Sequence, residues 1–151
     1  MTNRKAFLDM LAWSEIGPAL LAESDNGYNV LVGSTPAHPL LFNSYAHHPH
    51  VINHALNSSA AGRYQIIYPT YFNLCHMLGV SDFEPDTQDN MAIQLISGRG
   101  ALEDVDLGNF ADAVAKCAAE WASLPGGTSG QPSHSLADLE KIYISMGGEL
   151  A

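Results

Sequence analysis

The sequence predicts one small α+β domain over residues 1–151, mainly helical with a small antiparallel sheet. Three observations support this fold class. Hydrophobic residues make up 46% of the chain, which is enough for one core and argues against disorder. Several apolar segments repeat at helical spacing and stop at Gly or Pro. Two short runs in the first half are β-like and lie between turn signals.

The helices are predicted from their apolar spacing and from the residues that end them. In the first helix, Phe7, Leu8 and Leu11 lie on one face, ahead of a Gly-Pro break. Pro69 suits a first helical position and Gly79 suits a C-terminal stop, so a helix is expected between them. The five predicted ranges are 3–14, 69–79, 85–98, 109–124 and 135–146.

The predicted sheet uses two short extended runs, residues 27–33 and residues 62–68. Between them, residues 34–57 hold three prolines and five of the seven histidines, and we expect a loop there. No internal repeat or long linker divides the chain, which favours a single domain.

The charge balance excludes some partners. Six Lys and Arg stand against sixteen Asp and Glu, so the formal net charge is −10. Such a chain should repel nucleic acid, and anionic membrane surfaces are disfavoured for the same reason. No apolar run is long enough for a membrane span, and no signal segment is recognisable. We therefore expect synthesis in the cytoplasm and no stable membrane insertion.

Histidines crowd residues 47–54, and such clusters can bind zinc. The nearby prolines argue against a helix there, and no H-E-x-x-H pattern occurs. Cys75 and Cys117 lack the spacing of a zinc or redox pair, so they are expected to be free thiols. No metal and no cofactor is predicted, and a zinc site in this loop remains the alternative.

Glu15 is the strongest candidate catalytic residue. It closes the mostly apolar run of residues 6–14 and lies next to Trp13, where a carboxylate is poorly solvated. Poor solvation raises the pKa of a carboxyl group, and a protonated carboxyl can act as a general acid. The alternative is a surface glutamate at a frayed helix end. Glycosidases usually need a second carboxylate, and the nearby Asp25 fits a turn at least as well.

A second polar group, residues 62–65, interrupts an apolar run. Strand alternation would place Arg63 and Gln65 on one side and Tyr64 on the other. Gln65 could hydrogen-bond a sugar hydroxyl or acetamide, and Tyr64 offers a flat face for a sugar ring. The alternative is a strand edge with a core tyrosine. Phosphate-binding, dinucleotide-binding and serine-hydrolase motifs are absent from the sequence.

Taken together, these segments resemble the lambda-type phage endolysins. The opening block runs from Arg4 to Glu15, and Ala61-Gly62-Arg63-Tyr64-Gln65 matches the A-G-R-Y-Q signature of that family. Trp121 to Gly126 matches its late helix end. The remaining matches, in family order, are Gly27-Tyr28, Val32-Gly33, Asp82-Phe83, Gln88-Asp89 and Arg99-Gly100-Ala101-Leu102.

The resemblance implies a lysozyme-like fold with two lobes around a sugar-binding cleft. It also implies a murein lytic transglycosylase, which cuts the β-1,4 bond between N-acetylmuramic acid and N-acetylglucosamine and leaves a 1,6-anhydro end. Glu15 matches the catalytic glutamate. The positions that match the family's cleft lining are Tyr28, Gly33, Tyr64 and Gln65.

This reaction needs no second carboxylate, because the C6 hydroxyl of the substrate attacks the anomeric carbon. Glu15 would protonate the leaving oxygen and then accept the hydroxyl proton. We also expect a monomer. Without a signal segment, the protein would need a membrane pore made by another protein to move from the host cytoplasm to the periplasm, and the resemblance identifies that protein as a holin. Two positions depart from the family pattern: Ile16 follows the glutamate where Gly is typical, and Ser129-Gly130-Gln131 lacks an expected aromatic.

Three other functions stay open at this stage. A hydrolysing muramidase on the same fold would use Asp25 or another acid to position water. A zinc amidase would use the histidine-rich loop. A non-catalytic module would bind the cell wall without cutting it.

Overall fold

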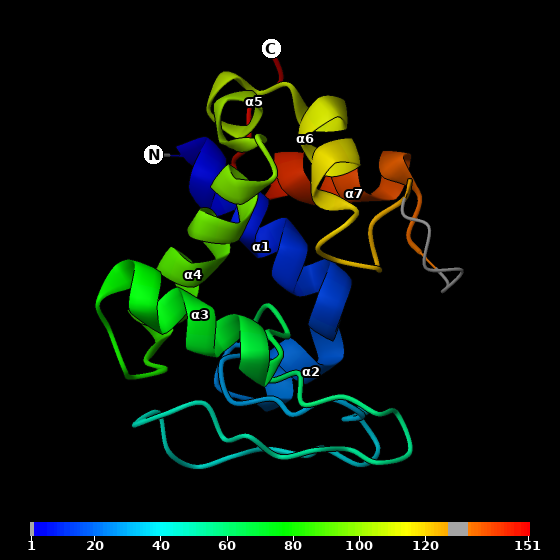
Figure 1. Ribbon diagram of the computed structural model, residues 1–151. Helices are drawn as coiled ribbons and strands as arrows, with labels where there is room; N and C mark the ends of the chain where they lie inside the picture. The colour runs from blue at the N-terminus through cyan, green and yellow to red at the C-terminus, as the bar shows by residue number, and fades with distance from the viewer. Residues whose placement is uncertain (1, 127–132) are drawn as a thin grey trace. The chain divides into compact units, whose positions relative to one another are not determined.

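The computed structural model describes residues 2–126 and 133–151 (Figure 1). Two compact units divide the chain. We call Met1–Glu15 with Ile93–Ala151 the terminal unit, and Ile16–Ala92 the middle unit. No helix in the described ranges is long and apolar enough to cross a membrane. The single-domain assignment stays a prediction, and residues 129–131 lie outside the described ranges.

The terminal unit is helical. Its helices are α5 (Leu102–Leu107), α6 (Phe110–Cys117) and α7 (Leu136–Ser145), together with most of α1 (Thr2–Ile16). Aromatic rings join three of them: Phe7 of α1 meets Phe110 edge-on at 6.0 Å, and Phe110 lies 4.7 Å from Tyr143 of α7. The hydroxyl of Ser135 accepts a hydrogen bond from the Asp138 amide and so caps α7.

The middle unit holds α2 (Pro18–Glu23), α3 (Tyr68–Leu78), most of α4 (Pro85–Gly98) and long loops. As predicted, Pro69 lies in the first turn of α3, and Gly79 ends the helix in the left-handed conformation. The loops pack on α3 through His48, which is buried among the rings of Tyr71 and Phe83.

The predicted antiparallel sheet is wrong. Within the described ranges the extended segments make only isolated bridges, for example Val30 with Leu41 and Ala61 with Ile66. The reason is local backbone geometry, because φ is positive at Gly33, Gly62 and Gln65 and cuts both predicted strands short. The described part of the chain is therefore mainly helical and does not contain the expected sheet.

Two helix predictions also need correction. The range 109–124 contains a shorter helix, which ends at Cys117. The apolar spacing misled the prediction because Trp121 and Leu124 remain buried in the turns that follow. Helices α2 and α5 were not predicted, since each has six residues and is too short to show a helical period.

Candidate active site

Glu15 lies in the last turn of α1, where its side chain is half-buried. Desolvation raises the pKa of its carboxyl group above the ordinary value. A hydrogen bond from the Ser123 hydroxyl acts in the opposite direction, because it favours the carboxylate. The poorly solvated surroundings of Glu15 thus favour its protonated carboxyl form, whereas the hydrogen bond from Ser123 stabilises its carboxylate form.

Ser123 is itself held by Ser14, since their hydroxyl oxygens are 2.7 Å apart. Each hydroxyl has one proton, so if Ser123 donates to Glu15, Ser14 must donate to Ser123. This order builds a short relay of hydroxyl groups that fixes the orientation of the Ser123 donor.

His134 contacts both Ser14 and Ser123. Its Nε2 lies 3.2 Å from the Ser14 carbonyl oxygen, a hydrogen bond that requires a proton on Nε2, and its backbone N–H donates to the Ser123 carbonyl at 3.0 Å. Its ring also lies 4.9 Å from that of Trp13. His134 therefore connects the segment that carries Ser123 to the end of α1, through its backbone N–H on one side and its ring on the other.

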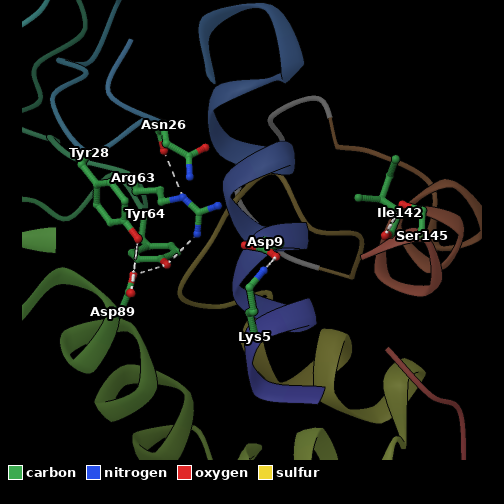
Figure 2. A network of polar contacts seen from close by, with 9 residues as sticks. All are labelled: Lys5, Asp9, Asn26, Tyr28, Arg63, Tyr64, Asp89, Ile142 and Ser145. Atoms are coloured by element: carbon green, nitrogen blue, oxygen red, sulfur yellow. Dashed lines mark hydrogen bonds and ion pairs between the residues drawn. The ribbon is translucent and has the colours of Figure 1, made fainter. Parts of the chain in front are cut away.

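In the middle unit, two of the predicted residues converge on one carboxylate. The Tyr64 hydroxyl donates to Asp89 at 2.6 Å, and the Tyr28 hydroxyl donates to the same carboxylate at 3.0 Å (Figure 2). Burial, followed by the charge of Asp89, raises the pKa of Tyr28 to about 12. Burial also raises the pKa of Tyr64, so both phenols stay protonated and act as donors at neutral pH.

Arg63 crosses this cluster. Its Nε donates to the Asn26 carbonyl at 3.0 Å, and one terminal nitrogen donates to the Tyr64 hydroxyl at 2.9 Å (Figure 2). Its guanidinium carbon lies 5.3 Å from the ring centre of Tyr28. The Tyr64 hydroxyl therefore bridges the Arg63 guanidinium and the Asp89 carboxylate, accepting a hydrogen bond from the first and donating one to the second.

Gln88 joins three segments of the middle unit from a fully buried position. Its amide nitrogen donates to the carbonyls of Tyr28 and Phe83, and its oxygen accepts from the Arg63 amide at 2.9 Å. A Cβ at position 62 would lie 2.3 Å from that oxygen, so only glycine fits beside Gln88.

The structure changes what the predicted binding residues can do. The ring of Tyr64 is 0% exposed and has no free face for a sugar. Residues 62–65 form a turn closed by Ala61 and Ile66, and not a strand. In that turn, the amide of Gln65 donates to the carbonyls of Val30 and Gly62.

Gly33 lies in a separate place, against Asn53. A Cβ at this position would be 2.6 Å from the Asn53 amide nitrogen, and the φ of +86° also favours glycine. Of the predicted binding residues, Tyr28 and Tyr64 thus share Asp89, Gln65 turns back on Val30, and Gly33 is not part of this hydrogen-bond network.

The histidine-rich loop does not resemble a zinc site. Among the described residues, no group of three or more His, Cys, Asp and Glu could hold a metal ion. Both ring nitrogens of His48 are engaged, because Nε2 lies 2.7 Å from the Ile66 carbonyl and Nδ1 accepts from the His50 amide. Burial lowers the pKa of His48, which favours its neutral form.

A pocket of about 650 Å³ lies next to this loop but includes none of the predicted site residues. Its lining consists mainly of aromatic rings and imidazoles from the loop and from α3. The residues are His47, His48, His50, Tyr68, Tyr71, Phe72, Cys75, His76, Gly79, Val80 and Ser81.

Sequence reasoning assigned no role to Ser123, His134, Gln88 or Asp89. Ser123 lies inside the matched block Trp121–Gly126, and Gln88-Asp89 is itself one of the matched pairs. The family resemblance therefore included these residues but did not indicate what they do. Nothing in the sequence pointed to His134.

Comparison with known proteins gives a consistent result. A sequence profile described as "Endolysin" matches residues 5–150. The endolysin of Escherichia phage lambda is 40% identical over 150 residues, which cover 97% of this chain and 92% of the relative. The endolysin of Escherichia phage P2 is also 40% identical, over 97% of this chain and 93% of the relative.

Solved structures agree with the sequence matches. Bacteriophage lambda lysozyme complexed with a chitohexasaccharide superposes with a TM-score of 0.91 at 38% identity, over 100% of this chain and 97% of that one. A second structure of lambda lysozyme gives a TM-score of 0.85. The lysozyme-like fold is therefore confirmed, although the expected sheet is not, and the chain belongs to the endolysin family.

Proposed function

We propose that this chain degrades peptidoglycan as a lytic transglycosylase. It would cut the β-1,4 bond between N-acetylmuramic acid and N-acetylglucosamine and leave 1,6-anhydro ends. Membership of the endolysin family supports wall degradation, and the chitohexasaccharide bound to lambda lysozyme supports a glycan substrate. No cofactor is needed for this chemistry.

The observation that carries the proposal is the environment of Glu15. Desolvation raises the pKa of its carboxyl group, and the Ser123 hydroxyl counteracts part of that rise. A group that must first give a proton and then take one back needs both forms to be accessible near the working pH. The two opposing influences on Glu15 suit this alternation.

The proposed reaction balances without water. The Glu15 carboxyl protonates the glycosidic oxygen as the bond from that oxygen to C1 breaks. The C6 hydroxyl of the same muramic acid attacks C1, forms the 1,6-anhydro bond and gives its proton to the Glu15 carboxylate. The second carboxylate of a hydrolase has no task in this scheme, and Asp25 already accepts a 2.6 Å hydrogen bond from Tyr45.

We further propose that Tyr28, Gly33, Tyr64 and Gln65 contribute to glycan binding. Because its ring is buried, Tyr64 would act by fixing Asp89 and Arg63 and would not stack on a sugar. We also propose that the protein acts as a monomer, is made in the host cytoplasm and reaches the periplasm through a holin.

The test combines one variant with product analysis. Glu15→Gln should abolish lysis, with a loss of about a thousandfold or more, while circular dichroism shows an intact fold. The matched control is Glu23→Gln at the exposed end of α2, which should keep full activity. Near-normal activity in the Glu15 variant would rule out its catalytic role.

Mass spectrometry of digested murein then distinguishes the reaction types. Transglycosylase products carry anhydro ends and lack one water relative to the products of hydrolysis. Products with ordinary reducing ends would assign the enzyme to the muramidases. Loss of activity on adding a chelator would favour the zinc amidase instead.

A further inference from the structure

The end of α1 lacks one of its ordinary backbone donors. In an α-helix, the carbonyl oxygen of each residue accepts a hydrogen bond from the amide four positions later. For the buried Ser14 that position is Pro18, which has no backbone N–H. The Ser14 carbonyl therefore cannot complete the regular helical pattern, and the next residue along the chain is Glu15. A group that donates to this carbonyl acts directly on the turn that carries the candidate acid.

The ring of His134 provides such a donor. Its Nε2 lies 3.2 Å from the Ser14 carbonyl oxygen, and its ring centre lies 4.9 Å from that of Trp13 in the same helix. A histidine that donates to a terminal carbonyl caps the C-terminal end of a helix. A proton on Nε2 is present in one neutral tautomer and in the imidazolium, so this hydrogen bond does not require a charged ring.

The same residue also holds the turn that carries Ser123. The His134 backbone N–H donates to the Ser123 carbonyl at 3.0 Å, and the hydroxyl oxygens of Ser14 and Ser123 are 2.7 Å apart. Three hydrogen bonds therefore form a closed circuit from Ser14 through His134 to Ser123 and back to Ser14. A closed circuit restrains its members more than separate bonds do, because no member can move without disturbing two contacts.

We infer that His134 is a positioning residue that holds the Ser123 hydroxyl against the Glu15 carboxyl group. The inference rests on the proposed catalytic role of Glu15. In this role His134 acts through Ser123 and the end of α1, and not on the reacting atoms. Glu15 is a carboxylate between giving its first proton and receiving the second, and a donor that is already in place stabilises that form without reorganisation.

A purely structural role for His134 predicts a different outcome. Loss of a helix cap lowers the free energy of unfolding but leaves the proton affinity of Glu15 unchanged. A positioning role changes that affinity, because burial raises the pKa of Glu15 and the hydrogen bond from Ser123 opposes that rise. The Glu15 pKa therefore distinguishes the two roles, and its measurement needs no substrate.

Carbon-13 NMR of the glutamate carboxyl groups in the full chain measures this pKa, and the Glu15 resonance is identified by its absence in E15Q. H134A should raise the Glu15 pKa, as S123A should. The maximal rate of murein cleavage should fall about fivefold, whereas the murein concentration at half-maximal rate should change little, because substrate binding is not altered. The control H76A, at an exposed histidine of α3, should match the wild type in both measurements.

Two conservative variants test the ring donor itself. The side-chain amide of H134Q can reach the position of Nε2 and should restore most of the activity and the Glu15 pKa of the wild type. The amide of H134N is one carbon shorter and should behave like H134A, so the comparison stands even where H134A does not fold. Equal behaviour of H134Q and H134N would overturn the role of the ring donor.

The double variant S123A/H134A decides whether His134 acts through Ser123. Its maximal rate should be no lower than that of S123A, because the hydroxyl that His134 positions is already absent. Losses that multiply, or a Glu15 pKa that is unchanged in H134A, would overturn the inference. In those outcomes E15Q would still be inactive, whereas an active E15Q would refute the proposed catalytic role itself.

Discussion

The terminal unit stabilises its polar groups with ion pairs, whereas the middle unit relies on hydrogen bonds within a mostly uncharged segment. In the terminal unit, Arg4 binds Asp106 through two hydrogen bonds of 2.7 and 2.8 Å. Further ion pairs among its described residues include Lys5 with Asp9, Arg99 with Glu120 and Lys116 with Asp104. In the middle unit, Gln88, Tyr64 and Asp89 hold the loops together. The difference follows from local structure. Helices satisfy their own backbone, but loops need side chains to reach buried backbone groups.

The largest expected effect of substitution is therefore in the middle unit. Gln88→Leu would remove the three hydrogen bonds that the Gln88 side chain makes with the carbonyls of Tyr28 and Phe83 and with the amide of Arg63, at a cost of about 3 kcal/mol or more. Thermal unfolding should show a Tm lower by roughly 10 °C. The control Gln94→Leu lies on the same helix, is half-buried and should change Tm little. Similar Tm values in both variants would refute the buried-amide argument.

Tyr64→Phe should have the next largest effect. It removes one hydroxyl that accepts from Arg63 and donates to Asp89, so we expect a loss of about 1–2 kcal/mol in unfolding free energy. Denaturant titration measures this loss. Tyr68→Phe is the matched control, because no hydrogen bond of the Tyr68 hydroxyl occurs among the described residues. A loss as large in the control would mean that the hydroxyl network contributes little.

Glu15→Gln should be slightly stabilising at neutral pH, by a Tm change on the order of 2 °C. A carboxyl whose pKa is raised on folding contributes stability below its unfolded pKa, and that stability is lost as the pH rises through the folded pKa. The advantage of the variant should therefore shrink on acidification toward about pH 4. A variant that is less stable at neutral pH would contradict the desolvation argument.

Ser123→Ala tests the influence of Ser123 on the pKa of Glu15 through the pH dependence of activity. Removing the donor to the Glu15 carboxylate should raise the pKa of Glu15 further, so the alkaline limb of the pH–activity profile should move to higher pH. Activity at the optimum should fall by about three- to tenfold, because the carboxylate is less stabilised when it accepts the proton. An unchanged alkaline limb would show that Ser123 does not tune Glu15.

The smallest effect should come from the ion pairs of the terminal unit. Arg4→Gln removes a pair whose side chains are about one-third exposed, so Tm should change by less than about 2 °C. The Asp106 pKa is lowered mainly by its hydrogen bond with Arg4, so this contribution should disappear as the pH falls through the folded pKa. Added salt should also reduce the difference. A larger change in Tm would mean that this pair does more than a surface contact.

The sequence predicted helices better than loops, for a physical reason. Pro69, Gly79 and Pro85 mark the ends of helices through their own backbone preferences, which do not depend on distant parts of the chain. The predicted strands failed because of backbone angles at Gly33, Gly62 and Gln65, which the alternation of apolar residues does not determine. The two runs are apolar, as predicted, but the structure forms turns with isolated bridges there in place of strands.

Prediction of the candidate site was limited by sequence separation. The apolar neighbours of Glu15 lie in the same helix, so its poor solvation was predictable. Ser123 and His134 approach the end of α1 from more than one hundred positions away, and no local pattern reveals that contact. Tyr64 was correctly considered as a core tyrosine, but Asp89 as the shared acceptor was not foreseen.

The terminal unit joins both ends of the chain, and this has a consequence for the order of synthesis. The Glu149 amide donates to the Asn3 side chain, and the hydrogen-bond partners of Ser14 include Ser123 and His134, which are synthesised much later. The middle unit is continuous, so its residues are all synthesised before the second half of the terminal unit. The surroundings of Glu15 are therefore completed only after residues 123 and 134 have been synthesised, more than one hundred residues after Glu15 itself.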